Sequence, residues 1–176
     1  MTLPPTPGQT IGPFFGYALP FPGDEHLVPP GTPGAVRLHG TVRDGAGAGV
    51  PDALVELWQT DGEGHVVQEP GSLHRDGWTF TGWGRASTDR TGHYSFTTLV
   101  PGAPFFAVTV FARGLLNRLF TRAYLPGATD DALLMSLDPD RRSTLVTTQD
   151  QTGYVFDVHL QGERETVFLA YPRHEA

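Results

Sequence analysis

The sequence predicts an all-β protein, a sandwich or barrel of about eight short strands. Three observations lead to this prediction. Glycine and proline account for 22 and 16 of the 176 residues, and no low-complexity segment holds them, so the chain must contain many turns. Short runs of alternating or continuous apolar residues follow one another between those turns. Only one segment has the pattern of a helix.

Residues 1–35 differ from the rest of the chain. Proline and glycine interrupt them repeatedly, and they show no sustained periodicity, which predicts an extended arm rather than a core element. The segment still carries large apolar side chains: Ile11, Phe14, Phe15, Tyr17, Leu19 and Phe21. Because a solvated tail rarely holds so many, we expect the arm to lie along its own domain or along a partner subunit.

From residue 36 the pattern becomes that of β-strands. Alternation of apolar and polar residues predicts half-buried strands at 35–42 and 53–58. The segment 105–111 is continuously apolar and rich in β-branched and aromatic residues, which favours a buried strand. Further strands are expected at 94–98, 119–124, 144–148, 154–160 and 166–170.

The one expected helix is Asp130–Leu137. Either Thr129 or Asp130 would cap its N-terminus, and Pro139 lies just beyond its end. The length of the chain suits one domain with a sizeable core, and there is no internal repeat. We therefore expect an N-terminal arm, residues 1–35, followed by a single β-sandwich, residues 36–176.

Composition and charge argue against several classes of function. Twelve basic and nineteen acidic residues give a net charge of −7, and no basic cluster offsets it, so nucleic acid is not an expected partner. The absence of cysteine excludes disulfides, thiolate metal sites and a cysteine nucleophile. The N-terminus has no secretory signal pattern, and the longest apolar run, Ala103–Ala112, is too short to span a membrane. A soluble cytoplasmic protein is the expectation.

No residue pattern predicts an autonomous active site. The seven histidines include no pair separated by two or four residues, so no strand or helix would present two imidazoles to one metal on the same face. The serines lack a G-x-S-x-G motif, and the glycines occur in turns rather than in a phosphate-binding pattern. The residues alone leave the function open.

Five motifs, in the same order along the chain, resemble the intradiol ring-cleavage dioxygenases. Residues 6–14 (TPGQTIGPF) resemble the arm of the family, and residues 54–61 (LVELWQTD) resemble one of its strands. Residues 84–102 (GRASTDRTGHYSFTTLVPG) match its core pattern. Residues 111–114 (FARG) and 161–168 (QGERETVF) resemble the alpha-type subunits of its hetero-oligomeric members. The likeness covers nearly the whole chain.

The resemblance implies a prealbumin-like β-sandwich and a part in the O₂-dependent cleavage of a catecholic acid. Enzymes of the family hold a non-haem Fe(III) with two tyrosinates and two histidines, and ferric iron activates the bound catecholate. Phe105 and Ala107 occupy the positions of the two histidines, and neither can coordinate a metal. Gly64–Val66 stand where many relatives have a ligand tyrosine. The resemblance therefore implies no metal site and no catalytic residue here, with the Fe(III) held by a homologous beta subunit.

The resemblance also implies which residues of this chain meet the substrate. In the family, the arm and the FARG arginine of the alpha-type subunit line the substrate pocket at the interface with the iron-binding subunit. By position, Thr10, Gly12, Pro13 and Phe14 would form the wall supplied by the arm. Phe14 replaces a tyrosine that is frequent in the family, so that hydroxyl is missing. Arg113 would face the carboxylate of the substrate through a charge-assisted, bidentate contact.

Two other interpretations stay open. A stand-alone intradiol dioxygenase would bind iron itself, and the missing His-x-His pair argues against it. A non-catalytic prealbumin-like module used for binding would explain the turns and the core, but neither the arm motif nor the FARG sequence. In that case Arg113 would be a solvated strand end and the arm a strap across its own sandwich.

Overall fold

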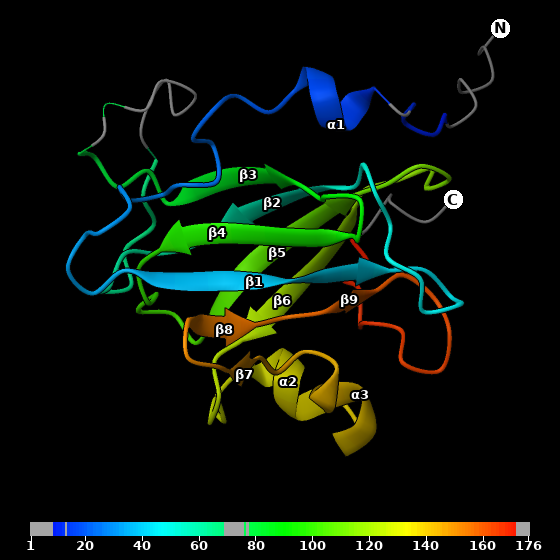
Figure 1. The fold of residues 1–176 in the computed structure, drawn as a ribbon. Helices are drawn as coiled ribbons and strands as arrows, with labels where there is room; N and C mark the ends of the chain where they lie inside the picture. The colour runs from blue at the N-terminus through cyan, green and yellow to red at the C-terminus, as the bar shows by residue number, and fades with distance from the viewer. Residues whose placement is uncertain (1–8, 13, 69–75, 77, 172–176) are drawn as a thin grey trace, which may run out of the picture.

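The computed structural model describes residues 9–12, 14–68, 76 and 78–171, which form two β-sheets packed face to face (Figure 1). One sheet has the order β4-β1-β8-β7, with β9 also paired to β1, and the other has the order β3-β2-β5-β6. The first sheet consists of β1 (Val36–Arg43), β4 (His93–Thr98), β7 (Thr148–Gln149), β8 (Gly153–Val155) and β9 (Val158–His159). The second consists of β2 (Leu54–Trp58), β3 (Trp83–Ser87), β5 (Phe105–Phe111) and β6 (Leu119–Tyr124). The predicted all-β sandwich is confirmed.

The strand registers explain how the sequence alternation becomes a core. β1 pairs antiparallel with β4 and parallel with β8 and β9, whereas β2, β3, β5 and β6 pair antiparallel with their neighbours. Alternate side chains of each strand therefore point between the sheets. These include Leu38, Val42, Tyr94, Phe96, Val55, Leu57, Phe106, Val108 and Val110, all essentially inaccessible to solvent. Full burial of one such side chain is worth about 1.5–3 kcal/mol, so this layer is the main source of stability.

The strands differ from the expectation in four places. β3 was not expected, because Gly84 and Arg85 interrupt its apolar pattern. The strand expected at 154–160 is divided into β8 and β9. Of the one expected at 144–148, only Thr148 belongs to a strand, and Val146 forms an isolated bridge to Tyr124. The segment 166–170 is not a strand either. The segment lies alongside β6 through isolated hydrogen bonds, such as that of Leu169 N–H to the carbonyl of Phe120. Its large apolar side chains are half-buried, and it forms no ladder.

Three short helices are present in the described residues where one was expected: α1 (Phe15–Ala18), α2 (Ala132–Ser136) and α3 (Pro139–Ser143). α2 is the expected helix, but its N-cap is Asp131, whose carboxylate accepts hydrogen bonds from the N–H groups of Leu133 and Leu134. The expectation of Thr129 or Asp130 at that position was wrong. Pro139 begins α3 instead of only following a helix end, since proline is favoured in the first turn.

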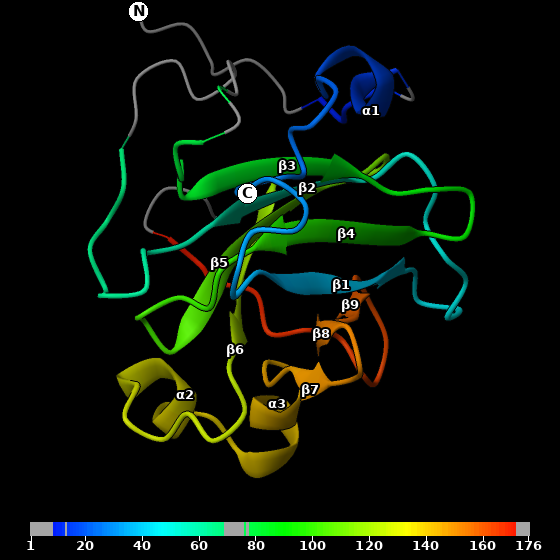
Figure 2. The same ribbon diagram turned by 60° about the vertical axis from the view of Figure 1, so that its left-hand side comes forward.

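The described part of the arm lies against the sandwich. α1 lies beside β3, over the outer side of the second sheet (Figures 1 and 2). Further along, His26 forms a bridge to Thr97 of β4, and Leu27 is buried within the core. No helix in the described ranges combines the length and the apolar character needed to cross a membrane.

Candidate functional site

The C-terminal end of β5 carries the arginine singled out by the sequence. Ala112 is buried, and Arg113 then leaves the sheet with its side chain 54% exposed. Gly114 has a φ of +88°, a conformation that glycine adopts without strain, and the chain turns there through a hydrogen bond from Leu115 N–H to the carbonyl of Ala112. The turn places the guanidinium at the surface.

The N-terminal arm reaches the same turn. The hydroxyl oxygen of Thr10 accepts a hydrogen bond of 2.7 Å from the N–H of Gly114. The ring of Phe15 packs on that of Phe111, with 5.4 Å between centroids, and the hydroxyl of Ser87 donates to the carbonyl of Gly16. Segments about a hundred residues apart in the sequence thus form one surface.

The residues that the sequence analysis assigned to the pocket wall have different environments. Thr10 is bound to the turn beside Arg113. The carbonyl of Gly12 accepts a hydrogen bond from Phe15 N–H, and there is open space around its Cα. Phe14 precedes α1 and is 77% exposed. Pro13 lies outside the described residues. Their role toward a substrate stays a prediction.

Arg113 has a partner that the sequence analysis did not identify. Its Nη2 lies 3.1 Å from Oδ2 of Asp52, and its Nε donates to Oδ1 of the same carboxylate at 3.3 Å. The carboxylate is only 13% exposed. The guanidinium is therefore held on one edge by a bidentate ion pair rather than free in solvent. The only sequence signal was a Pro-Asp turn before a strand, which is common to many proteins.

The other end of β5 carries the positions where the family resemblance places iron-binding histidines. The register sets Phe105 opposite Tyr124 and Ala107 opposite Arg122. The guanidinium carbon of Arg122 lies 4.1 Å from the centre of the Phe105 ring, and its Nη1 lies 3.0 Å from the carboxylate of Asp131. The Tyr124 hydroxyl also donates to Asp131, at 2.6 Å. Burial first, and this hydrogen bond second, raise the pKa of Tyr124 to about 12.

These residues do not fit a ferric ion. Phe105 and Ala107 have no side-chain atom that can coordinate a metal. The cation that faces the Phe105 ring is the guanidinium of Arg122, which is already paired with Asp131. At the third position implied by the resemblance, His65 is exposed and pairs with Asp61. Within the described ranges, no group of three or more histidine, cysteine or acidic side chains is arranged to hold a metal ion.

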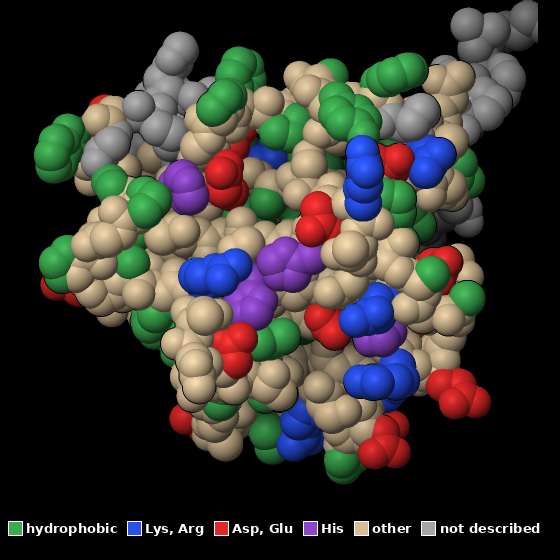
Figure 3. Space-filling view, viewed as in Figure 1, with side chains coloured by type: hydrophobic (Ala, Val, Ile, Leu, Met, Phe, Trp, Pro, Cys, Tyr) green, Lys and Arg blue, Asp and Glu red, His purple; other side chains and the backbone are tan. Residues whose placement is uncertain are grey.

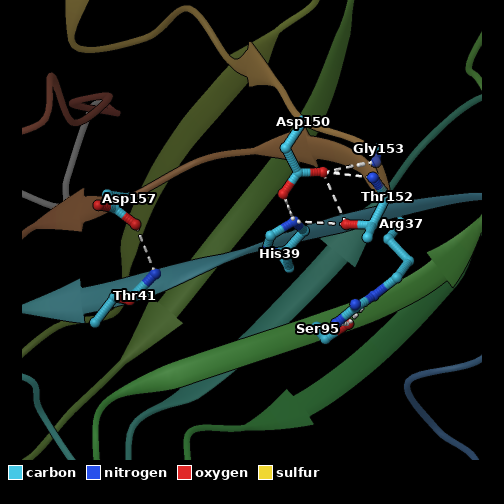
Figure 4. Close-up of polar contacts among 8 residues, drawn as sticks. All are labelled: Arg37, His39, Thr41, Ser95, Asp150, Thr152, Gly153 and Asp157. Carbon is cyan, nitrogen blue, oxygen red and sulfur yellow. Dashed lines mark hydrogen bonds and ion pairs between the residues drawn. The ribbon is translucent and has the colours of Figure 1, made fainter.

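A second polar region covers the outer face of the first sheet. Histidine and charged side chains gather over β1 and β4 in Figure 3. His39 lies 3.0 Å from Asp150, and Arg37 donates to the hydroxyl of Ser95 (Figure 4). Hydrogen bonds from the N–H and hydroxyl of Thr152 lower the pKa of Asp150 to about 2. These contacts join the 150–153 turn and β4 to β1, so a structural role accounts for them.

Comparisons with known proteins decide the family. A family model described as Dioxygenase matches residues 11–128. The alpha chain of protocatechuate 3,4-dioxygenase from Burkholderia cepacia is 37% identical, with coverage of 96% of this chain and 98% of that relative. The chain belongs to the intradiol ring-cleavage dioxygenase family. The Pseudomonas putida alpha chain is 34% identical with the same coverage, whereas the B. cepacia beta chain is 32% identical over 74% of this chain and 66% of its own length.

Solved structures of intradiol dioxygenases share the fold. The dioxygenase domain of a dioxygenase–carbohydrate-binding fusion from Streptomyces sp. SirexAA-E is 26% identical, with a TM-score of 0.55 over 90% of this chain and 99% of that one. Catechol 1,2-dioxygenase from Acinetobacter sp. ADP1 superimposes with a TM-score of 0.53 at 20% identity, over 76% of this chain and 55% of that one. At the lower identity the likeness concerns the fold alone.

Proposed function

We propose that this chain is the iron-free alpha subunit of a protocatechuate 3,4-dioxygenase and completes the substrate pocket of an iron-bearing beta subunit. The observation that carries the proposal is the match to alpha chains over essentially their whole length, against two thirds of the beta chain. The lack of metal donors at Phe105 and Ala107 supports it. Residues 1–35 would serve as interface and pocket wall, and residues 36–176 as the sandwich that presents them.

The reaction is the insertion of both atoms of O₂ into the ring of protocatechuate, which gives 3-carboxy-cis,cis-muconate. The ferric ion of the partner would activate the catecholate toward O₂. Arg113 of this chain would bind the ring carboxylate, so that the ring is held in one orientation. No proton transfer is assigned to this chain.

The arm would close the pocket beside that arginine. Thr10 anchors the arm at Gly114, and Gly12 and Pro13 would belong to the pocket wall. Phe14 would contribute an apolar ring. Its large exposure fits a residue that a partner covers. A chain without cysteine also fits the reducing cytoplasm, where we place the complex.

The test compares the isolated chain with the chain co-expressed with an iron-bearing beta subunit of the family. We expect the two to purify together, with O₂ uptake on protocatechuate by the complex and neither iron nor uptake in the isolated chain. Stoichiometric iron and red-brown colour in the isolated chain would establish a stand-alone dioxygenase instead. Failure to bind any beta subunit would favour a non-catalytic binding module.

A further inference from the structure

We infer that Asp52 is a positioning residue for Arg113: it fixes one edge of the guanidinium and thereby aims the opposite edge at the substrate carboxylate. The inference rests on the proposed function, since it assigns a task to the arginine of the shared pocket. It concerns the geometry of the arginine and not the chemistry of ring cleavage.

The ion pair leaves one edge of the guanidinium for an anion. Asp52 engages Nε and Nη2 of Arg113, which form the edge nearest the side-chain stem. The outer edge, formed by Nη1 and Nη2, carries the parallel N–H groups that a second carboxylate can accept in a bidentate manner. No hydrogen bond from Nη1 to a described residue is present. Because a bound carboxylate fixes the plane of the guanidinium, it also fixes where the outer edge points.

The turn that carries Asp52 is built to hold that carboxylate in place. Pro51 restricts the backbone at the second position of the Val50–Ala53 turn, and Asp52 at the third has a φ of +59°, unusual for a residue other than glycine. The buried hydroxyl of Thr88 bridges the turn, since it accepts from Ala53 N–H at 2.9 Å and donates to the carbonyl of Val50 at 2.8 Å. A fixed backbone therefore presents the carboxylate.

The same turn contacts the arm. A Cβ added to Gly16 of α1 would lie 3.0 Å from the carbonyl oxygen of Asp52, so the helix and the turn are in close contact. The other arm contact is the hydrogen bond of Thr10 to Gly114, the residue after Arg113. Asp52 thus lies between the arm and the arginine: its backbone carbonyl contacts α1, and its carboxylate holds Arg113.

Stability alone does not explain the pair. An ion pair with a half-exposed guanidinium contributes little to folding, because water screens it and long side chains lose entropy when they are held. A side chain in a sparsely populated backbone conformation is often found at a functional site. We therefore assign to the Asp52–Arg113 pair the task of orienting the guanidinium.

The test uses two substitutions that tolerate the backbone of residue 52. Asp52→Asn keeps a side chain suited to positive φ but removes the charge, and Asp52→Gly removes the side chain without backbone strain. Asp52→Ala would confound the result, because alanine is strained at this φ. The matched control is Asp157→Asn, which removes a carboxylate that pairs with Arg43 at 3.7 Å on the other sheet.

In the alpha–beta complex, we expect Asp52→Asn and Asp52→Gly to raise KM for protocatechuate about tenfold with little change in kcat. KM for catechol, which lacks the carboxylate, should stay unchanged, as should both constants in the Asp157→Asn variant. A merely structural role would instead change both substrates together, with a large fall in melting temperature. In an Arg113→Ala background, Asp52→Asn should have no further effect.

Three results would overturn the assignment. An unchanged KM would show that Asp52 positions nothing, and a lower KM would make Asp52 a competitor of the substrate for Arg113. Equal effects on protocatechuate and catechol would indicate a general distortion. Failure of the proposed function is distinguishable. In that case the wild-type complex itself would not consume protocatechuate, or Arg113→Ala would leave KM for protocatechuate unchanged.

Discussion

At the scale of single residues, Arg113 shows how contacts in the fold fix the orientation of a side chain at the end of a strand. Most arginines are solvated, and only the FARG motif separates Arg113 from them in the sequence. The structure adds the turn at Gly114, the anchor of Thr10 and the carboxylate of Asp52. A guanidinium held in this way has lost much of its rotamer freedom before any ligand arrives, so less entropy is lost on binding.

Arg113→Ala should raise KM for protocatechuate by roughly ten- to a hundredfold in the alpha–beta complex, because a charged hydrogen bond to the carboxylate is lost, worth about 1.5–3 kcal/mol. Catechol should be spared. Arg118→Ala is the control, since Arg118 is a nearby exposed arginine that lies over the ring of Phe120. Steady-state O₂ uptake on both substrates measures the effect. Equal loss on both substrates would exclude a contact with the carboxylate.

At the scale of elements, the sequence predicts the strands that have a regular apolar pattern. It misses the strands and segments whose position depends on contacts with residues far away in the sequence. β1, β2, β5 and β6 lie where the apolar pattern placed them. β3 was missed because its core-facing positions include Gly84, against which Leu27 of the arm packs. The segment 166–170 has a strand-like pattern but no partner ladder. The periodicity of one segment does not indicate which other segment pairs with it.

In the candidate site, too, the sequence indicates single residues but not the partners that the fold brings to them. The motif directed attention to Arg113, and the resemblance directed it to Phe105 and Ala107; their roles stay predictions. The partners could not be predicted, because Asp52 and Arg113 are 61 residues apart and Arg122 meets Phe105 only through the β5–β6 pairing. Only the fold brings these groups together.

Asp131 combines a helix cap with a link to the second sheet, so its loss should be costly. Asp131→Ala removes the cap of α2 and leaves Arg122 and Tyr124 without their shared acceptor. We expect a loss of about 2 kcal/mol or more in the free energy of unfolding. Asp130→Ala, the matched neighbour, should cost less than about 0.5 kcal/mol. Urea unfolding of both variants measures the difference. Similar losses would mean that Asp130 shares the capping role.

Histidines introduced in β5 in place of Phe105 and Ala107 should not create an iron site. In the Phe105→His, Ala107→His double variant, the guanidinium of Arg122 would still face the new imidazoles, and its positive charge opposes a cation. We expect iron content no higher than in the unmodified chain, measured by elemental analysis after incubation with ferrous or ferric salts. Stoichiometric iron in the double variant would contradict the view that Arg122 blocks this site.

At the scale of the whole molecule, the sandwich presents two different outer faces. The first sheet carries a polar face tied together by its own hydrogen bonds, around His39 and Asp150. The second sheet carries the arm at one end of β5. At the other end, Arg122 contacts Phe105 and Asp131. α1, which lies beside β3 of this sheet, carries the exposed Tyr17, and the exposed Phe14 precedes it. The division fits a subunit that meets its partner through the arm.

Alkaline pH should destabilise the fold through two buried tyrosines. Burial first, and the nearby charge of Asp157 second, raise the pKa of Tyr94, whose hydroxyl donates to the carbonyl of Phe156. The pKa of Tyr124 is raised to about 12 from an ordinary value of 10.0. A tyrosine whose pKa is raised in the folded state stabilises fully below the unfolded pKa, and this contribution is lost as pH rises through the folded pKa.

The free energy of unfolding should therefore fall between about pH 10 and pH 12, by about 2 kcal/mol for the Tyr124 contribution alone. Urea titrations across this range measure the slope. Tyr124→Phe should lower stability at neutral pH but make the alkaline slope smaller, because only Tyr94 of the two buried tyrosines still titrates. Tyr17→Phe, at an exposed tyrosine of the arm, should leave the slope as it is. If the slope survives in Tyr124→Phe unchanged, the ring is not protected in the folded state, and the contacts of Tyr124 with Asp131 and Arg122 are looser than their distances indicate.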